Sequence, residues 1–245
     1  MERLPSIVFD VNETILDIET LSPFFAKTLG SEHYLREWFS QLVLYSQCLT
    51  ITSHYSPFSM LGAEVLKMVA ATYNKTLSAQ DIDVFRDLIS RMPALPDVPV
   101  ALNKLKELGF KLHTLSNNAE ETLTAQLKSA GIAHYFERNF SVDKVVKSFK
   151  PSPSVYQYVE RELGLSGSDL YLVACHTWDI IGAKNVGWHG AMVLRKGNAI
   201  LNAGPQPDVV GENLLLVADK IIESYSNGGA NMPAVNPDDS ARDTV

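Results

Sequence analysis

The stretch SIVFDVNET at residues 6–14 decides the fold of this chain. Its first four residues form a short, mostly apolar run that stops at Asp10, a pattern typical of a buried parallel strand followed by a polar loop. Similar short apolar runs occur at 111–115, 170–174 and 191–194, and segments of helical periodicity alternate with them. This alternation indicates βαβ units. We therefore predict an α/β fold with a Rossmann-like parallel-sheet core.

A second pattern interrupts this core directly after the first strand. From about residue 16 to residue 91 the apolar residues recur at helical spacing, and Pro93, Pro96 and Pro99 then limit helix continuation. We therefore expect an inserted helical cap domain that closes over the strand ends. The predicted division is given by residue ranges: core 1–16 and 96–225, helical cap 17–95, and disordered tail 226–245.

Composition narrows the classes of function. The 245 residues include 21 Lys and Arg and 28 Asp and Glu, a formal net charge of −7, with no basic block. This argues against a broad nucleic-acid or anionic-membrane surface, because both require clustered positive charge. No export signal or window of ~18 consecutive apolar residues is present, so we expect a cytoplasmic protein. Cys48 and Cys175 lack metal-ligand spacing, and we expect both to be reduced and buried.

Polar side chains follow the predicted strands at four places. In open α/β sheets, ligands bind beyond the carboxyl ends of the strands, so these residues are candidates for chemistry. A carboxylate at the position of Asp10 can attack an electrophilic carbon and form an ester. The alternative is an Asp that caps the following turn. The four segments are DVNET at 10–14, SN at 116–117, KP at 150–151 and HTWD at 176–179.

These segments resemble, in order and context, the four motifs of the haloacid dehalogenase superfamily. The runs FDVNETILD, TLSNN, FKPSPSVY and HTWDIIGA are similar to the type II (L-)2-haloacid dehalogenases, over residues 7 to about 225. The resemblance implies hydrolysis of short-chain 2-haloacids to 2-hydroxyacids with inversion, through an aspartyl ester on Asp10. It implies a small anionic haloacid as substrate and no cofactor or metal, and it is compatible with a homodimer.

Asn12 separates this activity from its closest rival. Phosphatases of the superfamily carry a second Asp at this position, which protonates the leaving alkoxide, whereas an Asn has no proton to give. Halide leaves without a general acid, so Asn12 is compatible with carbon–halogen cleavage. The alternatives are a magnesium-dependent small-molecule phosphatase and a non-catalytic protein that reuses the fold for binding.

The resemblance assigns supporting roles at the next two strand ends. Ser116 and Asn117 would bond a carboxylate or the Asp10 oxygens, and they could also cap the next helix. Lys150, followed by Tyr156 at the family spacing, would hold Asp10 ionised. The alternative for Lys150 is a solvated surface residue.

Two positions depart from the family pattern. Glu13 replaces a usual Gly, and His176 replaces a usual Asn. Together they could hold and deprotonate the water that attacks the ester, because a neutral His is a suitable base near pH 7. The alternative is that His176 only caps a helix and Glu13 is exposed. Asp179 resembles the motif-four acid, which binds magnesium in metal-dependent relatives and hydrogen-bonds the Lys or a water in dehalogenases.

The predicted cap also departs from the family pattern. The family's carboxylate- or halide-binding Arg is missing from its usual place before the segment QLVLY at 41–45, and Arg36 lies about one turn back. Arg36 could reach in from there or be a solvated residue. Aromatic residues of the cap and of the last motif could line an apolar pocket or only the core. The candidates are therefore catalytic Asp10, Glu13, Thr14, Lys150, His176 and Asp179, and substrate-binding Asn12, Arg36, Phe39, Ser116, Asn117 and Trp178.

Overall fold

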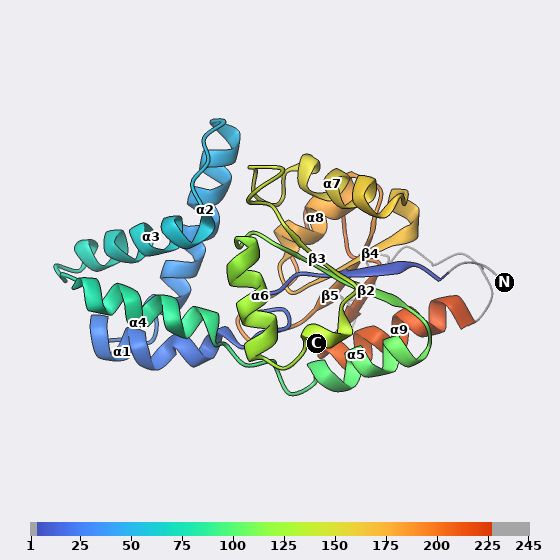
Figure 1. The fold of residues 1–245 in the computed structure, drawn as a ribbon, viewed down its shortest axis with the longest axis horizontal. Helices are drawn as coiled ribbons and strands as arrows, with labels where there is room; N and C mark the ends of the chain where they lie inside the picture. The colour runs from blue at the N-terminus through green and yellow to red at the C-terminus, as the bar shows by residue number, and fades with distance from the viewer. Residues whose placement is uncertain (1–3, 227–245) are drawn as a thin grey trace, which may run out of the picture.

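A six-stranded parallel sheet forms the centre of the molecule (Figure 1). The computed structural model describes residues 4–226, with the backbone alone at Ser226. The strand order is β3-β2-β1-β4-β5-β6, and every neighbouring pair is parallel. The predicted α/β class is thus confirmed. The strands are β1 Ser6–Phe9, β2 Lys111–Ser116, β3 Arg138–Ser141, β4 Leu170–Ala174, β5 His189–Val193 and β6 Val209–Gly211.

The central strand β1 sets the position of the following loop. All four of its residues are buried, as expected for a strand covered on both faces. Phe9 is in register with Thr114 of β2 and with Val173 of β4. Asp10 therefore leaves the sheet between the carboxyl ends of β2 and β4. The prediction that these strand ends share one edge is confirmed.

Helices cover both faces of the sheet. Figure 1 shows α7 and α8 on one side and α5 and α9 on the other. α6 packs against β3 and also contacts α4. Pro99 stands in the first turn of α5, where its missing N–H has no intrahelical partner to lose, so it opens this helix. The helices are α5 Val98–Glu107, α6 Glu120–Ser129, α7 Pro153–Leu163, α8 Thr177–Asn185 and α9 Leu214–Ser226, with short 3₁₀ turns at Ala133–Tyr135 and Gly167–Asp169.

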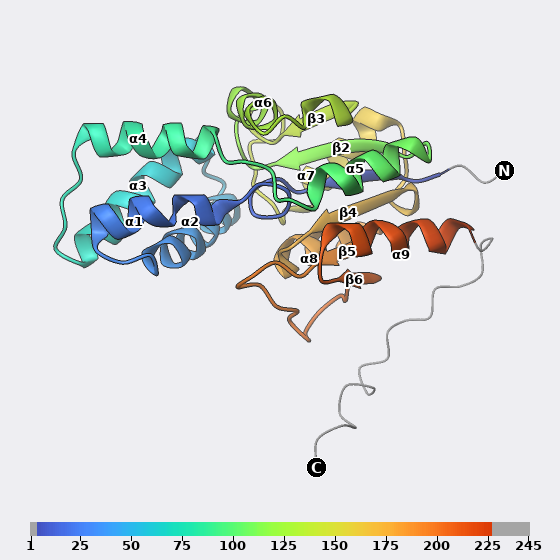
Figure 2. The ribbon, with the colours of Figure 1, turned by 90° about the horizontal axis from the view of Figure 1, so that it is seen from below.

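The predicted cap segment is helical and lies at one end of the sheet (Figures 1 and 2). The chain leaves and re-enters the core through paired backbone, since the Asp17 amide donates to the Pro93 carbonyl at 2.8 Å and the Leu95 amide to the Ile15 carbonyl at 3.0 Å. This pairing supports the division at 16/17 and 95/96, which we keep as a proposal. The elements are η1 Ile18–Leu21, α1 Ser22–Leu29, α2 Tyr34–Ile51, α3 Phe58–Thr72 and α4 Ala79–Ser90.

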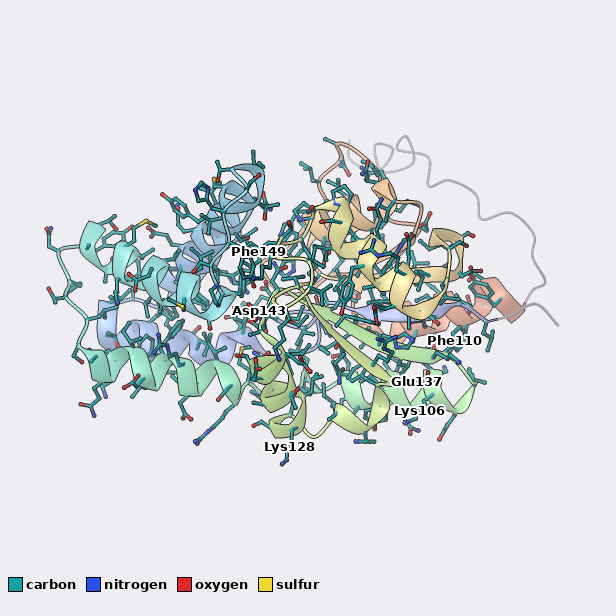
Figure 3. The ribbon with its side chains drawn as sticks, turned by 45° about the horizontal axis from the view of Figure 1, so that its top comes forward. Lys106, Phe110, Lys128, Glu137, Asp143 and Phe149 are labelled. Atoms are coloured by element: carbon teal, nitrogen blue, oxygen red, sulfur yellow. The ribbon has the colours of Figure 1, made fainter. Side chains whose placement is uncertain are left out.

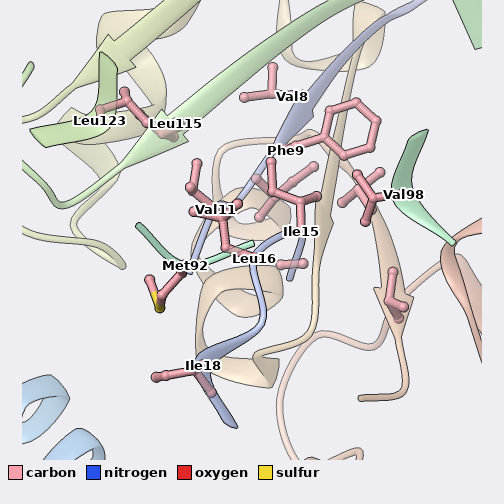
Figure 4. Close-up of a cluster of buried hydrophobic side chains, with 14 of the residues drawn as sticks. Val8, Phe9, Val11, Ile15, Leu16, Ile18, Met92, Val98, Leu115 and Leu123 are labelled. Atoms are coloured by element: carbon pink, nitrogen blue, oxygen red, sulfur yellow. The ribbon is translucent and has the colours of Figure 1, made fainter. Parts of the chain in front are cut away.

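Apolar packing continues from the sheet into this crossing. Figure 4 shows Val8 and Phe9 of β1 together with Val11, Ile15 and Leu16 of the following loop, all fully buried. Burial of these side chains stabilises the loop, each by roughly 1.5–3 kcal/mol relative to exposure. The polar residues between them are consequently held by an apolar frame on both sides.

A second set of contacts joins the cap helices to the core near α2. The Tyr55 hydroxyl donates to Asp143 at 2.5 Å, and the Tyr55 ring stacks on Phe149. In Figure 3, Asp143 and Phe149 lie between the helices α1–α4 and the sheet. Phe149 directly precedes Lys150, so this contact links the cap to a candidate site residue.

The predictions for the two cysteines and for the C-terminal tail are only partly met within the described residues. Cys48 is exposed on α2, so the prediction that both cysteines are buried is wrong for it, whereas Cys175 is buried. Of the predicted tail 226–245, Ser226 is the last residue of α9, and residues 227–245 lie outside the described part. No helix within residues 4–226 has the length and apolar character needed to cross a membrane.

Candidate active site

Asp10 lies at the end of β1 with both carboxylate oxygens engaged. Oδ1 accepts a hydrogen bond from Lys150 Nζ at 2.7 Å, and Oδ2 accepts one from the Thr14 hydroxyl at 2.7 Å. His176 Nδ1 lies 3.3 Å from Oδ2. The Thr14 hydroxyl in turn accepts the Cys175 backbone amide at 3.0 Å. Thr14 belongs to the same loop as Asp10, whereas Lys150 and His176 come from distant segments. Together these contacts hold the carboxylate in one orientation.

Lys150 is buried, so the solvated-surface alternative is wrong: only 1% of its side chain is exposed. Its ammonium donates to Asp10 Oδ1 at 2.7 Å, to Asp179 Oδ2 at 2.6 Å and to the Leu115 carbonyl at 3.1 Å. These three bonds use all three N–H donors of the ammonium group. Lys150 is therefore a fixed cation between two carboxylates.

Asp179 and Tyr156 complete this side of the site. The Tyr156 hydroxyl donates to Asp179 Oδ1 at 2.5 Å, and both side chains are fully buried. Gly182 permits the close packing, because an added Cβ there would stand 2.7 Å from both Pro151 Cβ and Tyr156 Cε2. The sequence indicates Tyr156 only through its place one turn into the helix that follows Lys150, at the family spacing.

The charges on this side are set by burial and by the ion pairs. Burial alone would raise the pKa of Asp10, but Lys150 and His176 hold that pKa well below its ordinary value. Burial likewise opposes the charge on Lys150, yet Asp10 and Asp179 raise its pKa. Burial raises the pKa of Asp179 even though Lys150 counteracts it. Asp10 is accordingly ionised across the physiological range.

The other side of Asp10 carries His176 and Glu13, the two departures from the family pattern. His176 Nε2 lies 2.8 Å from Glu13 Oε2. Glu13 is buried in a left-handed backbone conformation, with φ of 67°. His176 precedes α8 but makes no side-chain capping bond, and its ring stacks on Trp178 with centroids 5.0 Å apart. The alternatives of a capping His and an exposed Glu are therefore wrong.

His176 and Glu13 form an ion pair in this state. Burial opposes a charged imidazole, but the adjacent Cys175 sulfur and the Asp10 and Glu13 carboxylates raise the pKa of His176 well above its ordinary value. Burial would raise the pKa of Glu13, but His176 and Arg36 lower it. A charged imidazole cannot accept a proton. Service as a base therefore requires that His176 first lose one.

Arg36 lies behind Glu13, away from Asp10. Its guanidinium donates to Glu13 Oε1, to Glu19 Oε1 at 2.5 Å and to the Lys196 carbonyl at 3.0 Å. Arg36 is therefore not a free surface residue. It also does not line the cavity beside Asp10, so the structure does not bring it together with the other predicted substrate-binding residues.

A cavity of about 20 Å³ adjoins Asp10. Of the six predicted substrate-binding residues it brings together all except Arg36. Val43 and Phe58 also line it, and they were not predicted because apolar helix residues carry no separate signal of a pocket. The lining comprises Asp10, Asn12, Phe39, Val43, Phe58, Ser116, Asn117, Lys150, His176 and Trp178.

The amides near the cavity are held by further contacts. Asn117 Oδ1 accepts the Lys150 backbone amide at 3.0 Å, and Ser116 Oγ accepts the Asn118 amide at 3.1 Å. Asn12 Oδ1 accepts Gln126 Nε2 at 3.1 Å. The helix-capping alternative for Ser116 and Asn117 is wrong, because the residue before α6 is Ala119 and no side chain caps that helix. No sequence signal pointed to Gln126.

The side chains around Asp10 do not suit a divalent cation. Potential donor atoms of Asp10, Cys175 and His176 lie within 4.8 Å of one another. Of these three groups only Asp10 offers oxygen atoms, because Cys175 offers sulfur and His176 offers nitrogen. The Lys150 ammonium already bridges Asp10 and Asp179. Magnesium prefers oxygen ligands in near-octahedral geometry, which this set does not offer.

Comparisons with known proteins agree with the motifs. A family model described as haloacid dehalogenase-like hydrolase matches residues 5–187. The chain is 29% identical to (S)-2-haloacid dehalogenase 4A of Burkholderia cepacia, over 81% of this chain and 86% of that protein. It is 27% identical to the (S)-2-haloacid dehalogenase of Pseudomonas sp. strain YL, over 85% and 90%.

The fold agrees as well. The solved structure of L-2-haloacid dehalogenase from Xanthobacter autotrophicus superposes with a TM-score of 0.83 at 23% identity, covering 90% of this chain and 99% of that one. The resemblance drawn from the four motifs is thus confirmed. Because the matching family model spans about three quarters of the sequence, the chain belongs to the haloacid dehalogenase-like hydrolases.

Proposed function

We propose that this enzyme hydrolyses short-chain 2-haloacids to 2-hydroxyacids with inversion, through an aspartyl ester on Asp10. The observation that carries the proposal is the state of Asp10: a carboxylate beside a cavity, bonded at 2.7 Å to the buried ammonium of Lys150. Asn12 stands two positions after Asp10 and has no proton to give to a leaving group. Halide is the leaving group that requires none.

In the first step an Asp10 oxygen attacks the carbon that bears the halogen. The oxygen–carbon bond forms as the carbon–halogen bond breaks, and halide leaves with the bonding electrons. Attack occurs from behind the halide, so the configuration of this carbon inverts. Lys150 keeps Asp10 ionised for this step, and Thr14 fixes its orientation. The amides and hydroxyl of Asn12, Asn117 and Ser116 would bind the substrate carboxylate.

In the second step water attacks the carbonyl carbon of the ester. Ester formation removes the negative charge of Asp10, which is one of the groups that raise the pKa of His176. The Nδ1 proton can then leave to solvent, while Glu13 holds the Nε2–H at 2.8 Å. Neutral Nδ1 takes one proton from the attacking water. The bond between the carbonyl carbon and the ester oxygen then breaks, and this oxygen takes the other proton of the water to become the product hydroxyl. Asp10 is regenerated as a carboxylate that contains the water oxygen.

The rival phosphatase function has less support. It would require an acid at the position of Asn12 and a magnesium site, and Lys150 bridges the two carboxylates expected to hold that ion. The net charge of −7 argues against nucleic-acid or anionic-membrane partners. A cytoplasmic location stays part of the proposal.

Halide release tests the proposal. We expect chloride or bromide release from one enantiomer of 2-chloro- or 2-bromopropanoate, undiminished by EDTA, and formation of the inverted 2-hydroxyacid. Release of phosphate from small phosphoesters, dependent on magnesium, with no halide release from either enantiomer, would contradict it.

A further inference from the structure

A second, larger cavity lies between the cap helices and the core, next to the site of Asp10. Its volume is about 230 Å³, against about 20 Å³ for the cavity beside Asp10. Half of its lining consists of apolar side chains of η1, α2, α3 and α4. The polar lining residues are Asn12, Ser59, Arg86, Ser90, Asn118 and Thr122. We call it the cap cavity, and its main apolar wall consists of Ile18, Leu21, Trp38, Leu42, Phe85 and Ile89.

Three side chains separate the cap cavity from Asp10. Asn12, Phe39 and Phe58 line both cavities, so each of these side chains contacts the cap cavity and also the cavity beside Asp10. Asn12 is fixed by Gln126, whose Nε2 donates to its Oδ1 at 3.1 Å. The two aromatic rings belong to the cap helices α2 and α3. The partition is therefore one side chain thick, and two of its three members are aromatic rings of the cap helices.

The space beside Asp10 is small for a haloacid. A volume of about 20 Å³ is close to the ~10–15 Å³ that holds one water molecule. The reacting carbon can occupy this space, but a substituent on that carbon needs room elsewhere. The adjoining cap cavity has the room and offers an apolar wall on η1, α2 and α4. For comparison, a cavity of ~150 Å³ lined by Leu, Ile and Phe can hold a benzene molecule.

We propose that the cap cavity binds the substituent at C2 of the substrate, and that this substituent is an apolar group up to about the size of benzyl. The inference rests on the proposed dehalogenation and extends its substrate class beyond short chains. Phe39 and Phe58 then contact the carbon chain where it passes from Asp10 into the cap cavity. Specificity follows from burial of apolar surface, which favours longer substituents.

A series of substrates with one halogen tests this. Bromide release is measured from bromoacetate, 2-bromopropanoate, 2-bromohexanoate and 2-bromo-3-phenylpropanoate. We expect kcat/KM to rise along the series by up to about fourfold per buried CH₂ group. A decline beyond 2-bromopropanoate would overturn the inference and leave the proposed function intact. Absence of bromide release from all four would overturn both.

Variants of residues in the wall of the cap cavity test whether the preference for longer substituents arises there. Ile89→Trp fills the cap cavity from α4, where Ile89 is half-buried. We expect the ratio of kcat/KM for 2-bromo-3-phenylpropanoate to that for bromoacetate to fall by about 10-fold or more. Leu88→Trp is the matched control: Leu88 is the preceding half-buried residue of α4 and lines neither cavity. It should leave the ratio unchanged.

Gly62→Ala keeps the test valid if the tryptophan variant fails to fold. An added Cβ at Gly62 would lie 3.6 Å from Trp38 Cζ2 and 3.7 Å from Leu42 Cδ2, which is ordinary contact. Ala also favours the helix over Gly. The added methyl group takes space from the cap cavity, so the same ratio should fall about two- to fourfold. An unchanged ratio in Gly62→Ala and in folded Ile89→Trp would show that the substituent binds elsewhere.

Discussion

The two sides of Asp10 differ in their access to solvent. On one side, Lys150, Asp179 and Tyr156 form a cluster whose side chains are at most 1% exposed. On the other, the contacts run from His176 through buried Glu13 to Arg36, which is 35% exposed, and end at the surface. Both sides place a cation against the same carboxylate, but only one connects it to water.

This difference separates two requirements of the proposed reaction. A buried cation whose ammonium donors are all used holds Asp10 ionised. A histidine between two carboxylates changes its proton affinity when one of them is esterified. We therefore assign the first step to the Lys150 side and the second step to the His176 side. Substitution of Asp10, His176, Lys150 or Glu13 tests this assignment.

The largest effect is expected from Asp10→Asn, because both sides act through this residue. The amide has nearly the same shape but is a poor nucleophile, so kcat should fall by about 10⁴-fold or more. Halide release under steady-state conditions measures the loss, and circular dichroism checks the fold. Turnover close to that of the wild-type enzyme would show that another residue forms the ester.

His176→Ala should slow the second step far more than the first. Loss of a general base typically costs about 10²- to 10⁴-fold, so the aspartyl ester should accumulate. The measurement is a mass increase on the peptide containing Asp10 after rapid quenching with a 2-haloacid. His134→Ala, at an exposed position, is the control. An active His176→Ala enzyme without trapped ester would leave Asp179 or Asn117 to position the water.

Lys150→Met should impair the first step instead. Removal of one electrostatic stabiliser costs on the order of 10²-fold or more, and no ester should accumulate. Lys150 is one of the groups that lower the pKa of Asp10, so its loss raises that pKa and shifts the acidic limb of the pH profile to higher pH. Lys144→Met, which is exposed and precedes Lys150 in the same segment, should behave as wild type.

Activity of Lys150→Met within twofold of wild type would contradict this role. Removing one member of a buried ion pair also costs about 3–5 kcal/mol of stability. The free energy of unfolding is therefore measured in parallel, to confirm that the variant is folded at the assay temperature.

Much of the fold could be predicted because its strong signals are local. β1 at Ser6–Phe9 and β4 at Leu170–Ala174 have the predicted bounds, since each is a wholly buried run of mostly apolar residues. β3 and β6 were missed. β3 begins with the exposed Arg138 and Asn139, and β6 has three residues, too few for periodicity to show.

The site residues, too, could be predicted where their signals are local and not where they depend on tertiary packing. Asp10 directly follows β1, His176 comes two residues after the end of β4, and Lys150 lies in the connection from β3 to α7. Parallel topology brings these three segments to one edge of the sheet. The contact of Arg36 with Glu13 could not be predicted, because it depends on how α2 is oriented against the core, which no local pattern encodes. The same holds for Gln126, which reaches Asn12 from the middle of α6.

Glu13→Gln should have the smallest effect, and it tests the coupling within the His176 side. Hydrogen bonding to Glu13 is one of the factors that raise the pKa of His176. Without that carboxylate the pKa of His176 falls, so the neutral, basic form appears at lower pH. The rising limb for ester hydrolysis, measured by single-turnover decay of the ester, should therefore move to lower pH.

The rate on the plateau of that profile should drop only about 10-fold, less than for loss of the base itself, because a Gln oxygen can still accept the Nε2–H. Glu19→Gln is the matched control, since Glu19 contacts the outer side of Arg36 and not His176. It should leave the limb in place. A limb that stays unchanged in Glu13→Gln would show that His176 does not act as the base, and that the path from Asp10 to the surface serves only to balance charge.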